Sequence, residues 1–144
     1  MATQDYKNHA RFIPLFHGVL FGVIVLTLIG SLVNLYLSIG NHDRLYSAAL
    51  IVVLDICLLF LFFFCRVFAL KAQDRAIRAE ENFRHYLLTG KPFDSRLTIR
   101  QIIALRFAPD DEFIALAKRA AEQGTAPDEI KKSVKNWRAD EYRV

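Results

Sequence analysis

The sequence has few of the residues and none of the motifs from which catalytic and metal sites are usually built. Its 144 residues include only two cysteines, four histidines and one tryptophan. It contains no GxxxxGK[ST] phosphate-binding loop, no GxGxxG, no CxxC, no HExxH and no GxSxG. We therefore expect a protein that is not an enzyme and that needs no metal ion and no cofactor.

The positions of the cysteines and histidines argue against an intrachain disulfide, a bis-histidine haem and a metal site in the second half of the chain. Cys57 and Cys65 lie eight residues apart in one apolar segment, which in a helix separates their Cα atoms by about 12 Å, too far for a disulfide within one chain. His17 is the only histidine inside an apolar segment, so bis-histidine haem ligation has no second ligand. His85 stands alone in the second half of the chain, which argues against metal chemistry there.

Apolar and charged residues are segregated along the chain. Hydrophobic residues make up 53% of the sequence and charged residues 24%. The apolar excess lies between Phe12 and Leu70, whereas all but three of the 19 Lys and Arg residues lie from Arg66 onward. Acidic residues are interspersed with these basic residues, which indicates a solvated helical surface more than a nucleic-acid-binding one. We expect the first half in lipid and the second in water.

Two apolar runs are long enough to cross a bilayer. The run Ala48–Leu70 contains only Asp55 and Arg66 as charged residues, and its length matches a hydrocarbon core of about 30 Å. The run 12–39 is about twice as long as the core of a cleaved signal peptide, so we interpret it as a first span. The connection 40–47 is short, which predicts an antiparallel hairpin over residues 12–70.

Basic residues flank the hairpin on one side only. Lys7 and Arg11 precede the first span, and Arg66 and Lys71 are the first of several basic residues around the end of the second. The connecting loop has no net charge. The positive-inside rule then predicts that the arm 1–11 and the tail both lie in the cytoplasm.

Small and polar residues interrupt both spans. Gly18 and Gly22 form a GxxxG pattern, which suits close packing either against the second span or in a dimer. Asp55 falls at the depth of Ser31 and within a turn of Asn34 if the hairpin is symmetric. A carboxyl group in hydrocarbon is costly unless it is protonated or hydrogen-bonded. These three residues therefore suggest either a structural hydrogen bond or a proton or ion site.

The second span is predicted to continue as a helix through 71–90. This segment contains no proline before Gly90, and Glu80 with Arg84 forms an i, i+4 pair. Small and aromatic residues then recur at alternating spacings of three and four, as in a heptad seam. They are Ala69, Ala72, Ala76, Ala79, Phe83 and Tyr86. Such a seam predicts a close neighbour, which is another copy, the N-terminal arm or a partner chain.

Residues 91–144 are predicted to form a small cap of three short helices. Thr98 and Gln101 match a capping box, and the helix that they start should end at Ala108–Pro109. A second helix should begin at Pro109 and stop at Gly124. Thr125 and Asp128 suggest the start of a third, with Ile130, Val134 and Trp137 on one stripe.

The cap offers two surfaces that could bind something. We expect a partner surface on the first two helices, made of Gln101, Ile102, Arg106, Phe107 and Phe113. The last helix carries basic residues beside a tryptophan, a combination suited to anionic lipid headgroups, less well to RNA, and equally compatible with a plain solvated face. These residues are Lys131, Lys132, Lys135, Trp137 and Arg138.

The run LTIRQIIALRFAPDDEFIALAKRA (Leu97–Ala120), which follows a two-span hairpin and the segment AQDRAIRAEENFRHYLLTGK, resembles an uncharacterised family of small bacterial membrane proteins. The resemblance covers nearly the whole chain, and its most specific part is Gln101–Phe107. It implies a bacterial inner-membrane location and no particular activity.

The sequence as a whole predicts an all-α membrane protein with a two-helix transmembrane hairpin, a second helix that extends into the cytoplasm, and a helical cap. The function that fits best is a non-enzymatic accessory or scaffold subunit, which contacts the lipid bilayer and associates with other membrane proteins or with itself. A small oligomeric channel or proton-coupled component built around Asp55 is the first alternative. A membrane tether for RNA or a ribosome is the second, although nucleic acid is the partner that the sequence favours least.

Overall fold

A computed structural model describes residues 4–6, 8 and 11–140 of the chain. The ordered elements of this part are all helices, and it contains no strand. Its elements are a π-helix, η1 (Pro14–Leu20), and the α-helices α1 (Phe21–Leu37), α2 (His42–Thr89), α3 (Ile99–Leu105), α4 (Asp110–Gln123) and α5 (Pro127–Ser133). The predicted all-α class is confirmed.

The chain divides into two compact units. Unit 2 is Phe12–Phe68, and unit 1 combines Met1–Arg11 with Ala69–Val144. Residues 42–68 of α2 belong to unit 2 and residues 69–89 to unit 1. The arm is described only in part, and Lys7 of the predicted basic flank lies outside the described residues.

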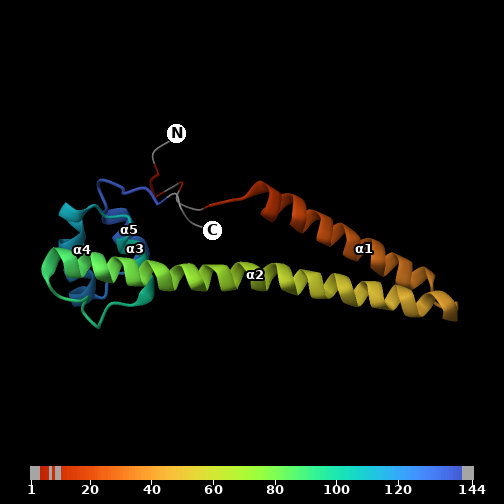
Figure 1. Cartoon of the computed structure of the whole chain (residues 1–144). Coiled ribbons are helices and arrows are strands. Elements are labelled where there is room, and N and C mark those ends of the chain that lie inside the picture. The colour runs from red at the N-terminus through yellow and green to blue at the C-terminus, as the bar shows by residue number, and fades with distance from the viewer. Residues whose placement is uncertain (1–3, 7, 9–10, 141–144) are drawn as a thin grey trace. The chain divides into compact units, whose positions relative to one another are not determined.

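Unit 2 consists of η1, α1 and the first part of α2, which run side by side in opposite directions (Figure 1). Aromatic rings join them, with the centroid of Phe62 at 4.4 Å from that of Phe16 and 5.4 Å from that of Phe21. Most of the large apolar side chains on both helices are exposed. The helices Pro14–Leu37 and His42–Thr89 are each long and apolar enough to cross a membrane.

The connection between the two apolar helices is shorter than the predicted 40–47. α2 already begins at His42, because Asn41 lies at its start and accepts a hydrogen bond from the backbone N–H of Arg44 through Oδ1 (3.3 Å). Gly40 precedes it with φ of +91°, a conformation that glycine adopts without strain. An Asn cap and a glycine turn thus replace the longer loop that we expected.

In unit 1, α3, α4 and α5 pack against one another, and the last part of α2 lies beside them (Figure 1). Its largest fully buried side chains are Leu105, Phe107, Phe113 and Ile130. Local signals start and stop the helices as predicted. Thr98 and Gln101 form the capping box of α3, and Gly124 ends α4 in the left-handed conformation.

The last helix departs from the prediction at both ends. Ala126 stands at its start without a side-chain cap, so Thr125 and Asp128 do not have the capping role expected of them. α5 ends at Ser133, and Val134 is extended rather than helical. Trp137 therefore reaches the core from an irregular tail and is not part of a helical stripe.

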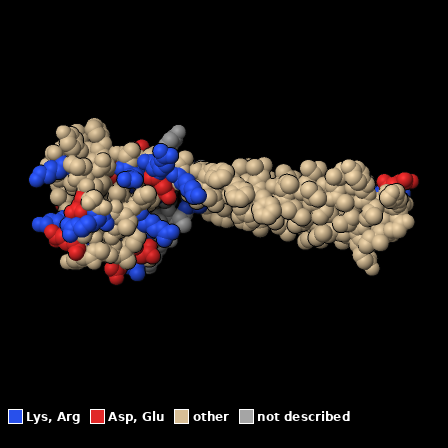
Figure 2. Space-filling model, turned by 90° about the horizontal axis from the view of Figure 1, so that it is seen from below, with Lys and Arg blue, Asp and Glu red and all other residues tan. Residues whose placement is uncertain are grey.

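Charge separates the two units as the composition suggested. Figure 2 shows Lys, Arg, Asp and Glu gathered over unit 1, whereas the surface of unit 2 is almost free of them except at one end. Asp43 and Arg44, next to the connection between α1 and α2, are exposed. The two units thus present surfaces of opposite character.

Candidate functional site

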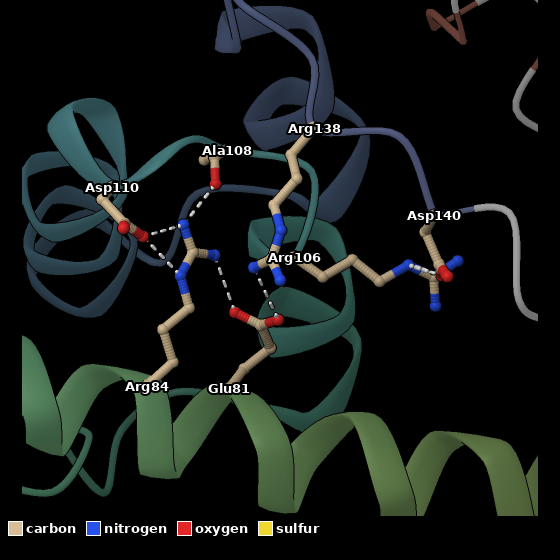
Figure 3. A network of polar contacts seen from close by, with 7 residues as sticks. All are labelled: Glu81, Arg84, Arg106, Ala108, Asp110, Arg138 and Asp140. Carbon is tan, nitrogen blue, oxygen red and sulfur yellow. Dashed lines mark hydrogen bonds and ion pairs between the residues drawn. The ribbon is translucent and has the colours of Figure 1, made fainter.

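A network of arginines and carboxylates ties α2 to the rest of unit 1 (Figure 3). At its centre, Arg84 donates hydrogen bonds to the buried carboxylate of Glu81 (3.0 Å), to Asp110 Oδ1 (2.7 Å) and to the carbonyl oxygen of Ala108 (2.8 Å). Its guanidinium also lies 4.2 Å from the ring centroid of Phe113. Arg84 thus holds α2 to the start of α4 at several points.

The C-terminal segment joins the same network. Arg138 Nη1 lies 3.8 Å from Glu81 Oε1, and the backbone N–H of Arg138 donates to the carbonyl oxygen of Phe107 (2.8 Å). Arg106 Nε lies 3.1 Å from Asp140 Oδ2 (Figure 3). The acidic and basic groups of this network compensate one another, so it is suited to fixing the fold of unit 1 rather than to chemistry.

This network was only partly visible in the sequence. The i, i+4 spacing predicted that Arg84 pairs with Glu80, but Arg84 instead contacts Glu81 and Asp110. Glu81 faces the cap and Glu80 faces outward, since one residue along a helix turns a side chain by about 100°. The helix-initiating position of Asp110 was apparent from the sequence, but its nearness to Arg84 required the tertiary structure.

The predicted partner surface lies inside unit 1. Gln101, Ile102, Phe107 and Phe113 are buried, and the side chain of Arg106 is 9% exposed. Gln101 Nε2 donates to the carbonyl oxygen of Thr125 (2.9 Å), in addition to the role of Gln101 in the capping box. We correct this prediction: these residues form the core of the cap, because α5 and the tail cover the face that the sequence left open.

The predicted lipid-contact residues divide into two groups. Trp137 stacks on Phe107 at 4.6 Å between ring centroids and packs against the core, so it does not point freely outward. Arg138 contacts Glu81, and Lys131 contacts Asp128 at 3.4 Å. The side chains of Lys132 and Lys135 are exposed, and Lys132 lies 5.3 Å from the ring centroid of Tyr6. Only part of the expected basic face is therefore displayed.

A groove of about 490 Å³ lies between α2 and the segment that leads to α3. Arg75 and Arg78 line it, and neither has an ion-pair partner among the described residues. Asp94 also lines the groove, but Arg96 bonds to it through both its side chain and its backbone N–H. These bonds lower the pKa of Asp94 to about 2 from 3.8. Because Arg96 balances Asp94, the two arginines make the groove basic.

The predicted heptad seam lies on the face of α2 that points away from the cap. Ala69 is half-buried, whereas Ala72, Ala76, Ala79, Phe83 and Tyr86 are exposed. We call these five exposed residues the α2 seam. Ile77 and Glu81, on the opposite face, are buried against the rest of unit 1.

In unit 2, Asp55 is buried, with 7% of its surface exposed. Its Oδ2 atom has no hydrogen-bond partner among the residues that the structure describes. Ser31 is also buried, but its hydroxyl donates to the carbonyl oxygen of Leu28 (2.9 Å), and Asn34 is exposed. The structure thus does not bring Ser31 and Asn34 to Asp55 as hydrogen-bond donors, because a serine in a helix readily bonds to its own backbone.

The two glycines of the GxxxG pattern have open space in front of them. A Cβ atom built on Gly18 or Gly22 would meet no neighbouring atom within 4 Å. The prediction that they allow close packing against the second span is therefore wrong for this chain by itself. Packing in a dimer remains a prediction.

In the described residues, no three His, Cys, Asp or Glu side chains are grouped so that they could hold a metal ion. A family model described as "Family of unknown function (DUF6526)" matches residues 1–144. The chain belongs to this family. The family match confirms the resemblance to an uncharacterised family over the full length. No curated protein and no solved structure is significantly similar to the chain.

Proposed function

We propose that this member of DUF6526 is a non-enzymatic integral membrane protein of the bacterial inner membrane. In this proposal, η1–α1 and the apolar part of α2 form a transmembrane hairpin with both chain ends in the cytoplasm. Unit 1 is the cytoplasmic cap, and the protein serves as an accessory or scaffold subunit of a larger membrane complex.

One observation carries the proposal: unit 2 exposes its apolar side chains instead of burying them. Leu15 and Leu26 are each 70% exposed. In the most apolar 18-residue stretch of each helix, only 11% (Pro14–Leu37) and 17% (His42–Thr89) is buried. Exposed apolar patches of this extent are not stable in water, and lipid is the solvent that accepts them. Unit 1 has a buried core and a charged surface of its own, as an aqueous domain requires.

The orientation follows from charge. Arg11 precedes the first apolar helix, and Arg66, Lys71 and Arg75 mark the end of the second apolar run. The turn between the helices has one acidic and one basic residue close by, Asp43 and Arg44. Positive charge is retained on the cytoplasmic side, which supports placing the turn outside.

Cysteine labelling in intact cells tests location and orientation together. Cys57 and Cys65 are replaced by Ser, and single cysteines are introduced by Asp43→Cys and Lys135→Cys, both at exposed positions. A membrane-impermeant maleimide should label Asp43→Cys in intact cells and Lys135→Cys only after the cells are opened. Labelling of both in intact cells, or release of the protein by carbonate, would contradict the proposal.

The scaffold role predicts a defined set of membrane proteins that co-purify in mild detergent. The matched comparison is Lys132→Glu with Lys135→Glu, which changes exposed charges, against Lys118→Glu on α4, which is also exposed. Loss of specific partners with the first pair alone would locate the partner at the end of α5 and the start of the tail. Purification of the protein with no reproducible partner would argue against a scaffold.

A second candidate function, in a proton-coupled or ion-conducting oligomer, is favoured by the buried, unpartnered Oδ2 of Asp55. Two helices cannot enclose a pathway, so this function requires several copies or a partner. The test is proton and ion flux in liposomes for the native protein and for Asp55→Asn. Flux that is lost in Asp55→Asn while assembly is retained would support it, and no flux from the native protein would exclude it.

A further inference from the structure

The α2 seam is an apolar helix face that the packing of unit 1 leaves uncovered. Its members recur at alternating spacings of four and three residues, as heptad a and d positions do. Phe83 and Tyr86 are 62% and 53% exposed, although both lie in a unit whose other aromatic rings are mostly buried or half-buried. The cap packs against the opposite side of the helix, through Ile77, Glu81 and Arg84.

We propose that the α2 seam is a self-association surface, on which a second copy of this chain packs in parallel as a short coiled coil. The alanines at 72, 76 and 79 allow two helices to approach closely. Phe83 and Tyr86 then contact their counterparts and leave water at the end of the seam. The α2 residues that the cap buries, Ile77 and Glu81, lie on the opposite face, and the seam side chains stay exposed beside the cap.

The charged residues beside the seam favour pairing with a second copy in parallel orientation. With Ala76, Phe83 and the preceding Ala69 at position a, Arg75 occupies position g and Glu80 the following position e. In a parallel pair, g of one helix lies beside the next e of the other, so Arg75 meets Glu80 in both directions. Both side chains are exposed and have no ion-pair partner among the described residues. An antiparallel pair would place g beside g and would not form these contacts.

The parallel arrangement rests on the proposed function in one respect. Two copies inserted in a membrane with the same orientation present α2 in parallel. Confinement to the bilayer also raises their effective concentration, which matters because the seam from Ala72 to Tyr86 covers only about 21 Å of helix.

Cysteine cross-linking of the full-length protein in membranes tests the inference. In a background with Cys57→Ser and Cys65→Ser, Ala72→Cys and Tyr86→Cys place a thiol at each end of the seam. Both should form disulfide-linked dimers on mild oxidation, since each seam position meets its own copy in a parallel pair. Arg78→Cys, at an exposed position off the seam, is the matched control and should not cross-link.

A charge exchange tests the register. Arg75→Glu or Glu80→Arg alone should weaken dimerisation roughly tenfold, because two symmetric pairs are lost and like charges face each other. The double variant Arg75→Glu/Glu80→Arg should restore it to the native level. Fluorescence photobleaching of single molecules in liposomes gives the dimer fraction independently of any cysteine.

The outcomes separate this inference from the proposed function. A protein that resists carbonate extraction but stays monomeric, or that cross-links as well through Arg78→Cys as through the seam, would overturn the inference and leave membrane insertion intact. Cross-linking at only one end of the seam would overturn the parallel register. Seam cross-linking in a protein that carbonate releases would uphold the dimer and contradict the proposed function.

Discussion

The two units of this protein distribute polar and apolar groups in opposite ways. Unit 1 buries Phe107 and Phe113 and exposes most of its charges, whereas unit 2 exposes most of its leucines and phenylalanines and buries Ser31 and Asp55. The hydrophobic effect requires the first arrangement in water, and its absence in lipid permits the second. One chain thus contains two folds that are each consistent with a different solvent, and the helix α2 has residues in both.

The largest expected effect contrasts a core aromatic residue with an exposed one. Phe113→Ala should lower the free energy of unfolding of unit 1 by about 3–5 kcal/mol, because a fully buried ring is replaced by a cavity. Phe64→Ala, at an exposed position in unit 2, should leave the free energy of unfolding of unit 1 unchanged. Trp137 is the only tryptophan and stacks on Phe107, so its fluorescence during urea titration in detergent follows unit 1 alone. Equal effects of the two changes would contradict the proposed difference in solvent.

The next contrast compares two arginine–carboxylate pairs within unit 1. Arg84→Ala should cost about 2–3 kcal/mol, since it removes a cation from the buried carboxylate of Glu81 and leaves Arg138 as the remaining contact of that group. Arg96→Ala breaks a pair with Asp94 that lies on the surface, and the midpoint of urea unfolding should fall by much less than in Arg84→Ala. A similar loss in both variants would show that the Arg84 network has no special structural role.

A smaller effect is expected at Gln101. Gln101→Ala removes the reciprocal half of the capping box and the bond to the Thr125 carbonyl, which should cost about 1–2 kcal/mol. Thr98→Ser keeps the cap hydroxyl and serves as the control. If Gln101 were instead an exposed partner contact, its replacement would leave stability unchanged and would affect only binding.

In unit 2, replacing a buried polar group by an apolar one should raise stability instead of lowering it. Asp55→Leu should stabilise the hairpin by about 1 kcal/mol, because it removes a carboxyl oxygen without a partner from an apolar environment. Loss of helical circular dichroism during titration with sodium dodecyl sulfate measures this. A destabilised hairpin would show that Asp55 finds a partner in the membrane, as an oligomer would provide.

The smallest expected effect is a pH dependence at the surface of unit 1. Asp94 has a pKa of about 2 in the folded chain and 3.8 as its ordinary value, so its contribution to stability is complete above pH 3.8 and is lost as pH falls toward 2. The difference in unfolding midpoint between the native protein and Asp94→Asn should therefore shrink between pH 5 and pH 2. A difference that stays constant would contradict the bond to Arg96.

Features that depend on a few neighbouring residues were predictable. The capping box of Thr98 and Gln101, the stop at Gly124 and the continuation of α2 to Thr89 all follow from short-range geometry. The missed boundaries also have local causes. Asn41 is a good helix cap and was a usable signal for the early start of α2. Nothing comparable marks the end of α5 at Ser133.

The candidate surfaces were harder to predict than the helices. A helical pattern shows which residues share a face, but not which neighbour covers that face. Gln101 and Phe107 were therefore placed on a partner surface, and packing of the tail through Trp137 instead makes them core. Arg84 was paired with Glu80 by spacing alone, whereas in the structure it contacts Glu81 and Asp110.

By itself, the sequence determined the all-helical class, the two apolar helices and most helix ends, because propensity, capping and hydropathy act over short stretches of chain. Only the tertiary structure decided which faces are buried. It enclosed the predicted partner residues, assembled the network around Arg84 from distant parts of the chain, and left the α2 seam open. These outcomes depend on contacts between residues far apart in the sequence, which no local sequence pattern predicts.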